Sequence, residues 1–246
     1  MSKLKGKVAL VTGGSRGIGA AIARCLAHEG ANVALTYNNS ADKANGVVAE
    51  IEQAGRRALS IAADSSDPSA IQAAVQKTVA EFGQLDILIN NAGIFVAKPI
   101  DELTLDDFEQ TININVKAVF IASQAAASQM GEGSRIITIG SNLAEHVPTP
   151  GLSLYSLSKS ALIGFTKGLA RDLGPRGITV NVVHPGSTDT DMNPANGEHS
   201  DGQRSLMAIS RYGAPDDIAG FVTWLASEES RFITGAGLTI DGGTNA

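Results

Sequence analysis

The chain has 246 residues, 43% of them hydrophobic, and a formal net charge of −6 at pH 7; this length suffices for one domain with a sizeable core, and the acidic balance argues against a nucleic-acid-binding surface. No apolar run approaches the roughly 20 residues of a membrane-spanning helix, and Met1–Lys7 lacks the apolar segment of a signal peptide. A single cysteine and four histidines without metal-ligand spacing exclude an internal disulfide and disfavour a metal site, so we expect a cytoplasmic globular protein with no nucleic-acid or membrane partner.

Short apolar runs alternate with longer helical patterns along the whole chain. The runs are continuous, which is typical of strands buried on both faces of a parallel sheet. The predicted strands are Val8–Val11, Val33–Thr36, Ala58–Ala62, Ile87–Ile89, Arg135–Ile139, Thr179–Val183 and Leu238–Ile240. The predicted helices lie near residues 17–29, 41–54, 67–82, 104–129, 154–173 and 215–226. This order predicts one α/β domain over residues 1–246, with a Rossmann-type doubly wound parallel sheet of about seven strands and helices on both faces.

A glycine-rich turn joins the first predicted strand to the first predicted helix. It reads Thr12-Gly-Gly-Ser-Arg-Gly-Ile-Gly19. Glycine lets the backbone approach a phosphate closely, and a helix start offers free N–H groups and the positive end of the helix dipole. The spacing G-x-x-x-G-x-G differs from the common dinucleotide motif, so a tight turn that binds nothing is the alternative.

Tyr155 and Lys159 stand four residues apart in a predicted helix and therefore share one of its faces. A phenol titrates at about pH 10 in water, and a neighbouring cation favours its ionised form. Such a pair suits acid/base chemistry between an alcohol and a carbonyl. Alone, the spacing equally describes a solvated helix face. The acid/base interpretation gains support from the glycine turn and from Ser141 upstream. Glu145 and His146, between Ser141 and Tyr155, either face a substrate or are solvated loop residues.

The region from about residue 190 to residue 212 is the longest irregular stretch, polar and glycine-bearing between a strand and the last long helix. A long excursion inside a compact domain is usually a lid or a binding loop. We therefore expect a substrate lid here, in which Leu206, Met207 and Ile209 line an apolar pocket.

These motifs, in this order, resemble the short-chain dehydrogenase/reductase family over essentially the whole chain. The resemblance implies a cofactor loop at Thr12–Gly19, a motif at Asn90-Asn-Ala-Gly93 that steadies the sheet beside the cofactor, and a nicotinamide-holding segment that begins at His184-Pro-Gly186. It assigns catalysis to Ser141, Tyr155, Lys159 and Asn115, with Asn142 as a weaker alternative to the serine. The predicted cofactor-binding residues are Gly13, Ser15, Arg16, Gly17, Ile18, Gly19, Tyr37, Asn38, Asn39, Ser40, Asp64, Asn91, Ala92, Gly93, Tyr155, Lys159, Pro185, Gly186, Thr188 and Thr190.

The end of the second predicted strand indicates which dinucleotide binds. NAD-dependent enzymes of this type generally carry an acidic residue there, which bonds the ribose 2′-hydroxyl. Tyr37 stands in its place, and Asn38-Asn-Ser40 follows with hydrogen-bond donors. Arg16 supplies a cation for a 2′-phosphate, although a merely solvated Arg16 is the alternative. The sequence therefore predicts NADP(H).

The resemblance implies an oxidoreductase that reduces a ketone, or oxidises the secondary alcohol, with Tyr155 as general acid/base. Lys159 is expected to lower the tyrosine pKa and to hold the nicotinamide ribose. Ser141 is expected to hydrogen-bond the carbonyl oxygen, and Asn115 to hold a water that links Lys159 to solvent. Many relatives are 3-oxoacyl-carrier-protein reductases, but the lid region offers only Arg204 and Arg211 to an acidic carrier protein, which favours a small ketone.

A second hypothesis comes from the same stretch of chain. The segments Asp189–Gly197 and Ser205–Ile209 resemble a subgroup that includes a cyclic-di-GMP-binding biofilm-dispersal protein. A nucleotide-binding regulatory protein on a reductase scaffold is thus an alternative, although the complete catalytic set favours an enzyme. A purely structural or interaction protein is the third alternative. The family resemblance also implies a homotetramer.

Overall fold

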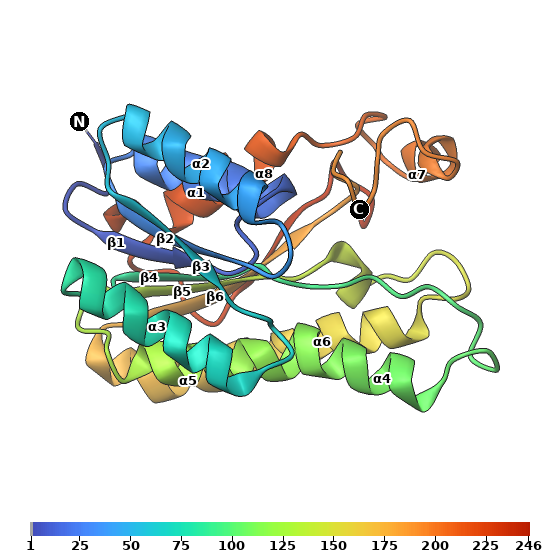
Figure 1. The fold of residues 1–246 in the computed structure, drawn as a ribbon. Helices are drawn as coiled ribbons and strands as arrows, with labels where there is room; N and C mark the ends of the chain where they lie inside the picture. The colour runs from blue at the N-terminus through green and yellow to red at the C-terminus, as the bar shows by residue number, and fades with distance from the viewer. Residues whose placement is uncertain (1) are drawn as a thin grey trace.

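The computed structural model describes residues 2–246 as alternating strands and helices (Figure 1). The strands are β1 Val8–Val11, β2 Asn32–Tyr37, β3 Ala58–Ala62, β4 Ile87–Asn90, β5 Arg135–Ile139, β6 Thr179–Pro185 and β7 Gly237–Ile240. The helices are α1 Gly17–His28, α2 Ala41–Gln53, α3 Pro68–Phe82, α4 Leu105–Ile112, α5 Ala118–Ala127, α6 Ser153–Leu173, α7 Ser200–Ser205 and α8 Pro215–Leu225.

All seven strands form one parallel sheet in the order β3-β2-β1-β4-β5-β6-β7. The chain runs outward from β1 in one direction to β3 and then restarts on the other side of β1 with β4. Beyond the carboxyl ends of β1 and β4 the two halves diverge, which is where ligands bind in doubly wound sheets. The predicted Rossmann-type fold is confirmed.

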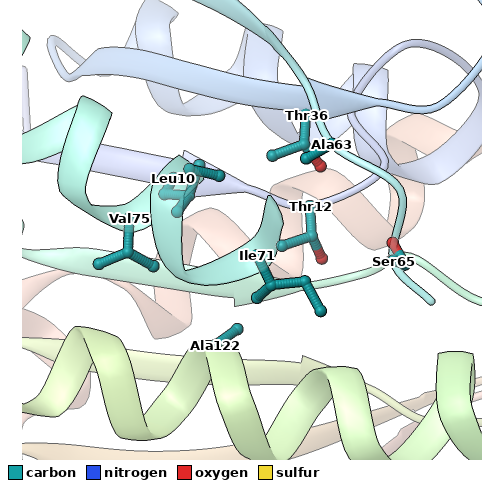
Figure 2. Close-up of a pocket in the computed structure, with 9 residues that line it drawn as sticks. Leu10, Thr12, Thr36, Ala63, Ser65, Ile71, Val75 and Ala122 are labelled. Carbon is teal, nitrogen blue, oxygen red and sulfur yellow. The ribbon is translucent and has the colours of Figure 1, made fainter. Parts of the chain in front are cut away.

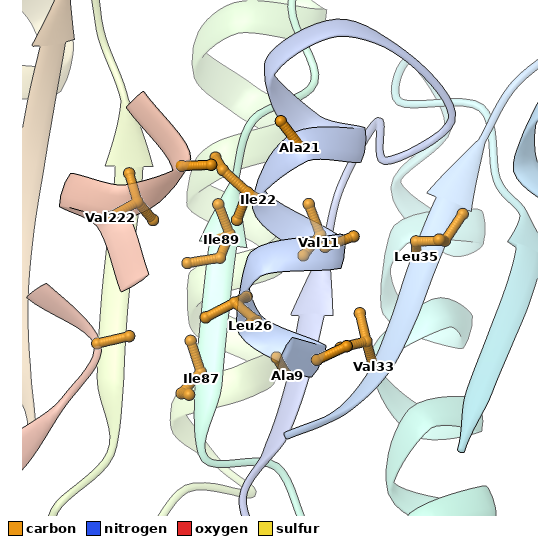
Figure 3. Packing of buried hydrophobic residues seen from close by; sticks show 14 of the residues in the cluster. Ala9, Val11, Ala21, Ile22, Leu26, Val33, Leu35, Ile87, Ile89 and Val222 are labelled. Carbon is orange, nitrogen blue, oxygen red and sulfur yellow. The ribbon is translucent and has the colours of Figure 1, made fainter. Parts of the chain in front are cut away.

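Helices cover both faces of the sheet: α1, α2 and α8 lie on one side, and α3, α5 and α6 on the other (Figure 1). Figure 3 shows Val11 and Ile89, from β1 and β4, packed with Ile22 and Leu26 of α1 and Val222 of α8. The intervening strand residues point to the opposite face and join the second core cluster. The inner strands β1, β4, β5 and β6 are buried on both faces and are mostly apolar, as the sequence pattern predicts, whereas the edge strands β3 and β7 are partly exposed.

The prediction of one continuous helix over residues 104–129 is wrong in detail, because the structure divides this segment into three parts. The segment consists of α4, a π-helical turn at Asn113–Lys117, and α5. A π turn is a one-residue widening of an α-helix and is often found at functional sites.

The lid region also contains α7, a short polar helix that lacks the apolar periodicity needed to predict it. Among the helices of residues 2–246, none is both long enough and apolar enough to cross a bilayer.

Candidate active site

The glycine turn between β1 and α1 is packed too tightly for side chains at several positions. Gly13 and Gly17 have φ values of +65° and +53°, in the left-handed region that favours glycine. A Cβ on Gly19 would lie 2.4 Å from both the Gly13 carbonyl oxygen and Asn91 Nδ2. Within the described chain, the N-cap residue Arg16 makes no side-chain capping bond. The first turn of α1 therefore presents its N–H groups as an anion site.

The Asn-Ala-Gly segment after β4 holds this turn in place. Thr12 Oγ1 accepts hydrogen bonds from the backbone N–H groups of Asn91 (2.9 Å) and Ala92 (3.1 Å). In return, Asn91 Nδ2 donates to the carbonyls of Thr12 (2.9 Å) and Gly13 (3.0 Å). The Asn91 side chain thus braces the glycine turn, which is how this segment steadies the sheet edge.

The residues expected near the adenine ribose lie at the ends of β2 and β3. Asn38 and Asn39 are exposed beyond β2, and Asp64 Oδ1 accepts from the backbone N–H and hydroxyl of Ser66, both at 2.8 Å. Arg16 Nη1 lies 3.7 Å from Asp191 Oδ2. Figure 2 shows a small pocket between the sheet and helices α3 and α5, lined by Leu10, Thr12, Thr36, Ala63, Ser65, Ile71, Ala74, Val75 and Ala122.

Tyr155 and Lys159 of α6 point toward the carboxyl end of β5. Lys159 Nζ donates to the Ile139 carbonyl (3.0 Å) and lies 5.7 Å from the centroid of the Tyr155 ring. The Phe95 ring packs edge-on against the Tyr155 ring, and the two ring centroids lie 4.8 Å apart. Lys159 is only 6% exposed, so the alternative of a solvated helix face is wrong.

Burial controls the charges of this pair. It raises the pKa of Tyr155 to about 12, and the neighbouring Ser141 hydroxyl offsets part of this rise. It also lowers the pKa of Lys159 to about 8. The net direction for the tyrosine is opposite to the expected one, because desolvation of the phenolate outweighs the hydrogen bond with Ser141. Tyr155 is therefore protonated at neutral pH.

Asn115 lies in the π turn and is 1% exposed. Its Oδ1 accepts from the Ile94 N–H (2.9 Å), and its Nδ2 donates to the Ile94 carbonyl and to Ser158 Oγ, both at 3.0 Å. These bonds use both N–H donors of the amide. The side chain thus ties the segment after β4 to α6, and the expected water relay stays a prediction.

Ser141 begins a 3₁₀ turn, Asn142–Ala144, directly after β5 and is 7% exposed. The Asn142 side-chain amide donates to Asn245 Oδ1 (3.4 Å), and Asn245 Nδ2 donates to the Asn142 carbonyl (2.9 Å). Asn142 is thus engaged by the C-terminal segment, which favours Ser141 over Asn142 as the substrate-facing residue. Glu145, farther along the loop, is exposed.

His184 contacts the backbone of Ser141, a contact that the sequence does not predict. Its ring is 0% exposed, and Nδ1 lies 2.9 Å from the Ser141 carbonyl oxygen and 3.3 Å from the Ser141 nitrogen. Burial is the main reason that its pKa is lowered, so the imidazole is neutral at pH 7. The residue is visible in the sequence only as the start of His184-Pro-Gly186, and Asn245 carries no sequence signal at all.

The nicotinamide-side segment continues from β6 into the lid. A Cβ on Gly186 would lie 2.6 Å from Asp241 Cα, so Gly186 allows β6 and β7 to meet closely. Thr188 Oγ1 donates to the Gly186 carbonyl (3.0 Å). Thr190 then reaches the glycine turn, because a Cβ on Gly17 would lie 3.3 Å from its methyl group. The predicted segment therefore spans from the sheet edge to the glycine turn.

A cluster of hydrogen-bonded polar side chains around Gln203 holds the lid in place. Its Oε1 accepts from the hydroxyls of Ser187 and Tyr212 and from Asn193 Nδ2, the last two at 3.0 and 2.9 Å. Two of the three residues predicted to line an apolar pocket, Leu206 and Ile209, are exposed. The third, Met207, is buried at 6% exposure, and the apolar pocket itself stays a prediction.

Comparisons with known proteins agree with this arrangement. A family model described as enoyl-(acyl carrier protein) reductase matches residues 13–245. The cyclic-di-GMP-binding biofilm dispersal mediator protein of Escherichia coli (strain K12) is 49% identical over 246 residues, which cover 100% of both chains. A short-chain dehydrogenase from Burkholderia cenocepacia J2315, solved in complex with NADP, has a TM-score of 0.98 and 64% identity over 99% of this chain and 100% of that chain. A blue fluorescent protein from a metagenomic library, solved with NADPH, has a TM-score of 0.98 and 55% identity over 99% and 100%. The chain therefore belongs to the short-chain dehydrogenase/reductase family of oxidoreductases.

Proposed function

We propose that the chain is an NADP(H)-dependent carbonyl reductase, which in the reverse direction oxidises a secondary alcohol. The observation that carries this proposal is the meeting of Ser141, Tyr155 and Lys159 at the carboxyl edge of the sheet: a hydroxyl beside a phenol, and an ammonium 5.7 Å from the phenol ring. A hydroxyl, a protonated phenol and a cation are the groups that a developing alkoxide requires.

The residues present fit an NADP(H) cofactor. The close approaches at Gly13 and Gly19 leave a bare backbone at the uncapped start of α1, which suits a pyrophosphate. Arg16 offers a cation for a 2′-phosphate, and Tyr37 replaces the acid that would repel it. The solved relatives that bind NADP and NADPH support the same choice. When bound, the cofactor supplies a hydride to the carbonyl carbon.

Each residue of the site then has a defined task in reduction. Tyr155, protonated at neutral pH, donates its proton to the carbonyl oxygen as that oxygen becomes an alkoxide. The Ser141 hydroxyl hydrogen-bonds the same oxygen and orients the substrate. Lys159 offsets the charge that Tyr155 acquires on losing the proton. In alcohol oxidation the proton returns from the alcohol to Tyr155.

The surroundings favour a small apolar ketone. The Phe95 ring, 44% exposed, forms an apolar wall beside Tyr155. The two arginines near the lid are paired, Arg204 with Asp201 at 2.7 Å and Arg211 with Asp217 at 3.2 Å. Two arginines, each beside a carboxylate, do not make the basic patch that docking of an acidic carrier protein requires.

A second candidate function is nucleotide-dependent regulation on the same scaffold. The observation that favours it is the Escherichia coli relative, which is named for cyclic-di-GMP binding and is 49% identical over the full chain. The catalytic residues are complete in this chain, so enzymatic activity and nucleotide binding are compatible.

The test is the loss of NADPH absorbance with a panel of small ketones, β-keto esters and an acyl-pantetheine mimic, with NADH in parallel. We expect turnover that prefers NADPH and that Tyr155→Phe abolishes, while calorimetric NADPH binding by the variant is nearly unchanged. Substantial turnover by the variant would refute the role of Tyr155. Tight NADPH binding without turnover of any ketone would favour the regulatory candidate, which a cyclic-di-GMP titration then examines.

A further inference from the structure

A carboxylate of the lid lies between two cations on the cofactor side of the sheet. Asp191 Oδ2 is 3.0 Å from Lys43 Nζ and 3.7 Å from Arg16 Nη1. Arg16 is the N-cap of α1, whereas Lys43 belongs to the first turn of α2, directly after the end of β2. Three segments that are far apart in the sequence thus meet at one oxygen atom.

The position of this cluster relates it to the 2′-phosphate. The end of β2 is where this fold places the adenine ribose, and Lys43 follows Ser40, the last residue predicted to contact that phosphate, by three positions. Two nitrogens that share one carboxylate oxygen are close enough to share one phosphate, which carries more charge and more acceptor oxygens than a carboxylate does.

We propose that Lys43 completes the 2′-phosphate subsite with Arg16, and that Asp191 is a resident anion which the 2′-phosphate displaces. This inference rests on the proposed NADP(H) function and extends it. Lys43 thereby selects NADP(H) over NAD(H). Asp191 opposes NADP(H) binding, because its pairing with both cations is given up when the phosphate arrives. NAD(H), which lacks that phosphate, leaves the Asp191 pairs intact.

Exposure makes this exchange easy. The side chains of Arg16, Lys43 and Asp191 are 59%, 57% and 58% exposed, and ion pairs at such sites are weak and screened by salt. A 2′-phosphate can therefore replace the carboxylate without a large opposing cost. The same screening predicts that the preference for NADPH over NADH narrows as the salt concentration rises.

The test is isothermal titration calorimetry with NADPH and NADH, which needs no substrate. Lys43→Ala is expected to raise the Kd for NADPH about tenfold, as loss of a charge-assisted hydrogen bond does, and to leave the Kd for NADH unchanged. Asp191→Asn is expected to lower the Kd for NADPH about threefold, the scale of an exposed ion pair, again without effect on NADH.

Two matched variants control for the change in net charge. Lys77→Ala removes an exposed lysine from α3, and Asp201→Asn removes another lid carboxylate, which pairs with Arg204 instead. Both are expected to keep wild-type affinity for either nucleotide.

The inference is overturned if Lys43→Ala weakens NADPH and NADH binding equally, or if Asp191→Asn leaves NADPH binding unchanged or weakens it. Failure of the proposed NADP(H) cofactor looks different, because the wild type would then bind neither nucleotide, and failure of the proposed carbonyl reduction shows in the absorbance assay and not in these affinities. If the wild type prefers NADPH but Lys43→Ala and Asp191→Asn bind both nucleotides as the wild type does, only the roles of Lys43 and Asp191 are refuted.

Discussion

Lys159 combines deep burial with a charge, so its replacement by methionine should stabilise the fold while it ends catalysis. Methionine keeps an unbranched chain of similar length and removes the ammonium. The wild-type side chain is 6% exposed, and burial lowers its pKa from the ordinary value of 10.5 to about 8. The folded state therefore disfavours the charged form that lysine has at pH 7.

The size of the effect follows from these values. At about 1.4 kcal/mol per pKa unit, the lowered pKa of Lys159 corresponds to a penalty of about 3 kcal/mol at pH 7. Methionine also loses the hydrogen bond to the Ile139 carbonyl, which costs about 1 kcal/mol. We therefore expect Lys159→Met to raise the free energy of unfolding by about 2 kcal/mol, or Tm by about 5 °C for a chain of this size.

The stability difference between Lys159→Met and the wild type should depend on pH in a definite direction. Because the folded pKa lies below the unfolded one, the penalty is complete below pH 8 and is relieved as the pH rises through the window from about 8 to 10.5. The stability advantage of the variant should therefore be largest at pH 7 and disappear above pH 10.5.

Urea unfolding, followed by circular dichroism at pH 7, 8.5 and 10, measures this advantage. Lys167→Met, the same change at an exposed site on α6, is the control and should alter stability by less than about 0.5 kcal/mol. If Lys159→Met is less stable than the wild type at pH 7, or if its advantage does not shrink with rising pH, the reasoning is refuted.

Two further substitutions probe the frame of the site. Gly19→Ala places a methyl group 2.4 Å from the Gly13 carbonyl oxygen and Asn91 Nδ2; we expect a loss of about 1–3 kcal/mol in stability and weaker NADPH binding, which thermal melts and calorimetry measure, and unaltered NADPH affinity would contradict the tight turn. His184→Ala removes the ring beside the Ser141 backbone; kcat should fall more than tenfold, the scale of a displaced oxyanion donor, while the Kd for NADPH changes less than twofold. Equal losses in kcat and in NADPH affinity would mean that His184 supports the fold as a whole.

Much of the fold was predictable because its signals are local. The apolar runs at Val8–Val11, Ala58–Ala62 and Arg135–Ile139 correspond to β1, β3 and β5 residue for residue. The π turn was not predictable, because it coincides with contacts of Asn115 with Ile94 and Ser158 that no sequence window contains.

The candidate site likewise has features that follow from the sequence and features that depend on the folded chain. Tyr155 and Lys159 are neighbours on a helix, so their pairing follows from their spacing. The direction of the tyrosine pKa does not, because it depends on how much protein surrounds the phenol. Likewise Lys43 and Asp191 meet only in the folded chain, 148 residues apart in the sequence, and nothing in either local sequence indicates the other.

Isotope transfer tests the proposed chemistry most directly. NADPH that carries deuterium at both positions of nicotinamide C4 is incubated with a ketone that the wild type reduces, and the alcohol is analysed by mass spectrometry. We expect one deuterium on the carbinol carbon with the wild type, and no labelled alcohol above the enzyme-free background with Tyr155→Phe. Unlabelled alcohol from the wild type, or labelled alcohol formed by the variant at the wild-type rate, would contradict reduction by hydride transfer with Tyr155 as the proton donor.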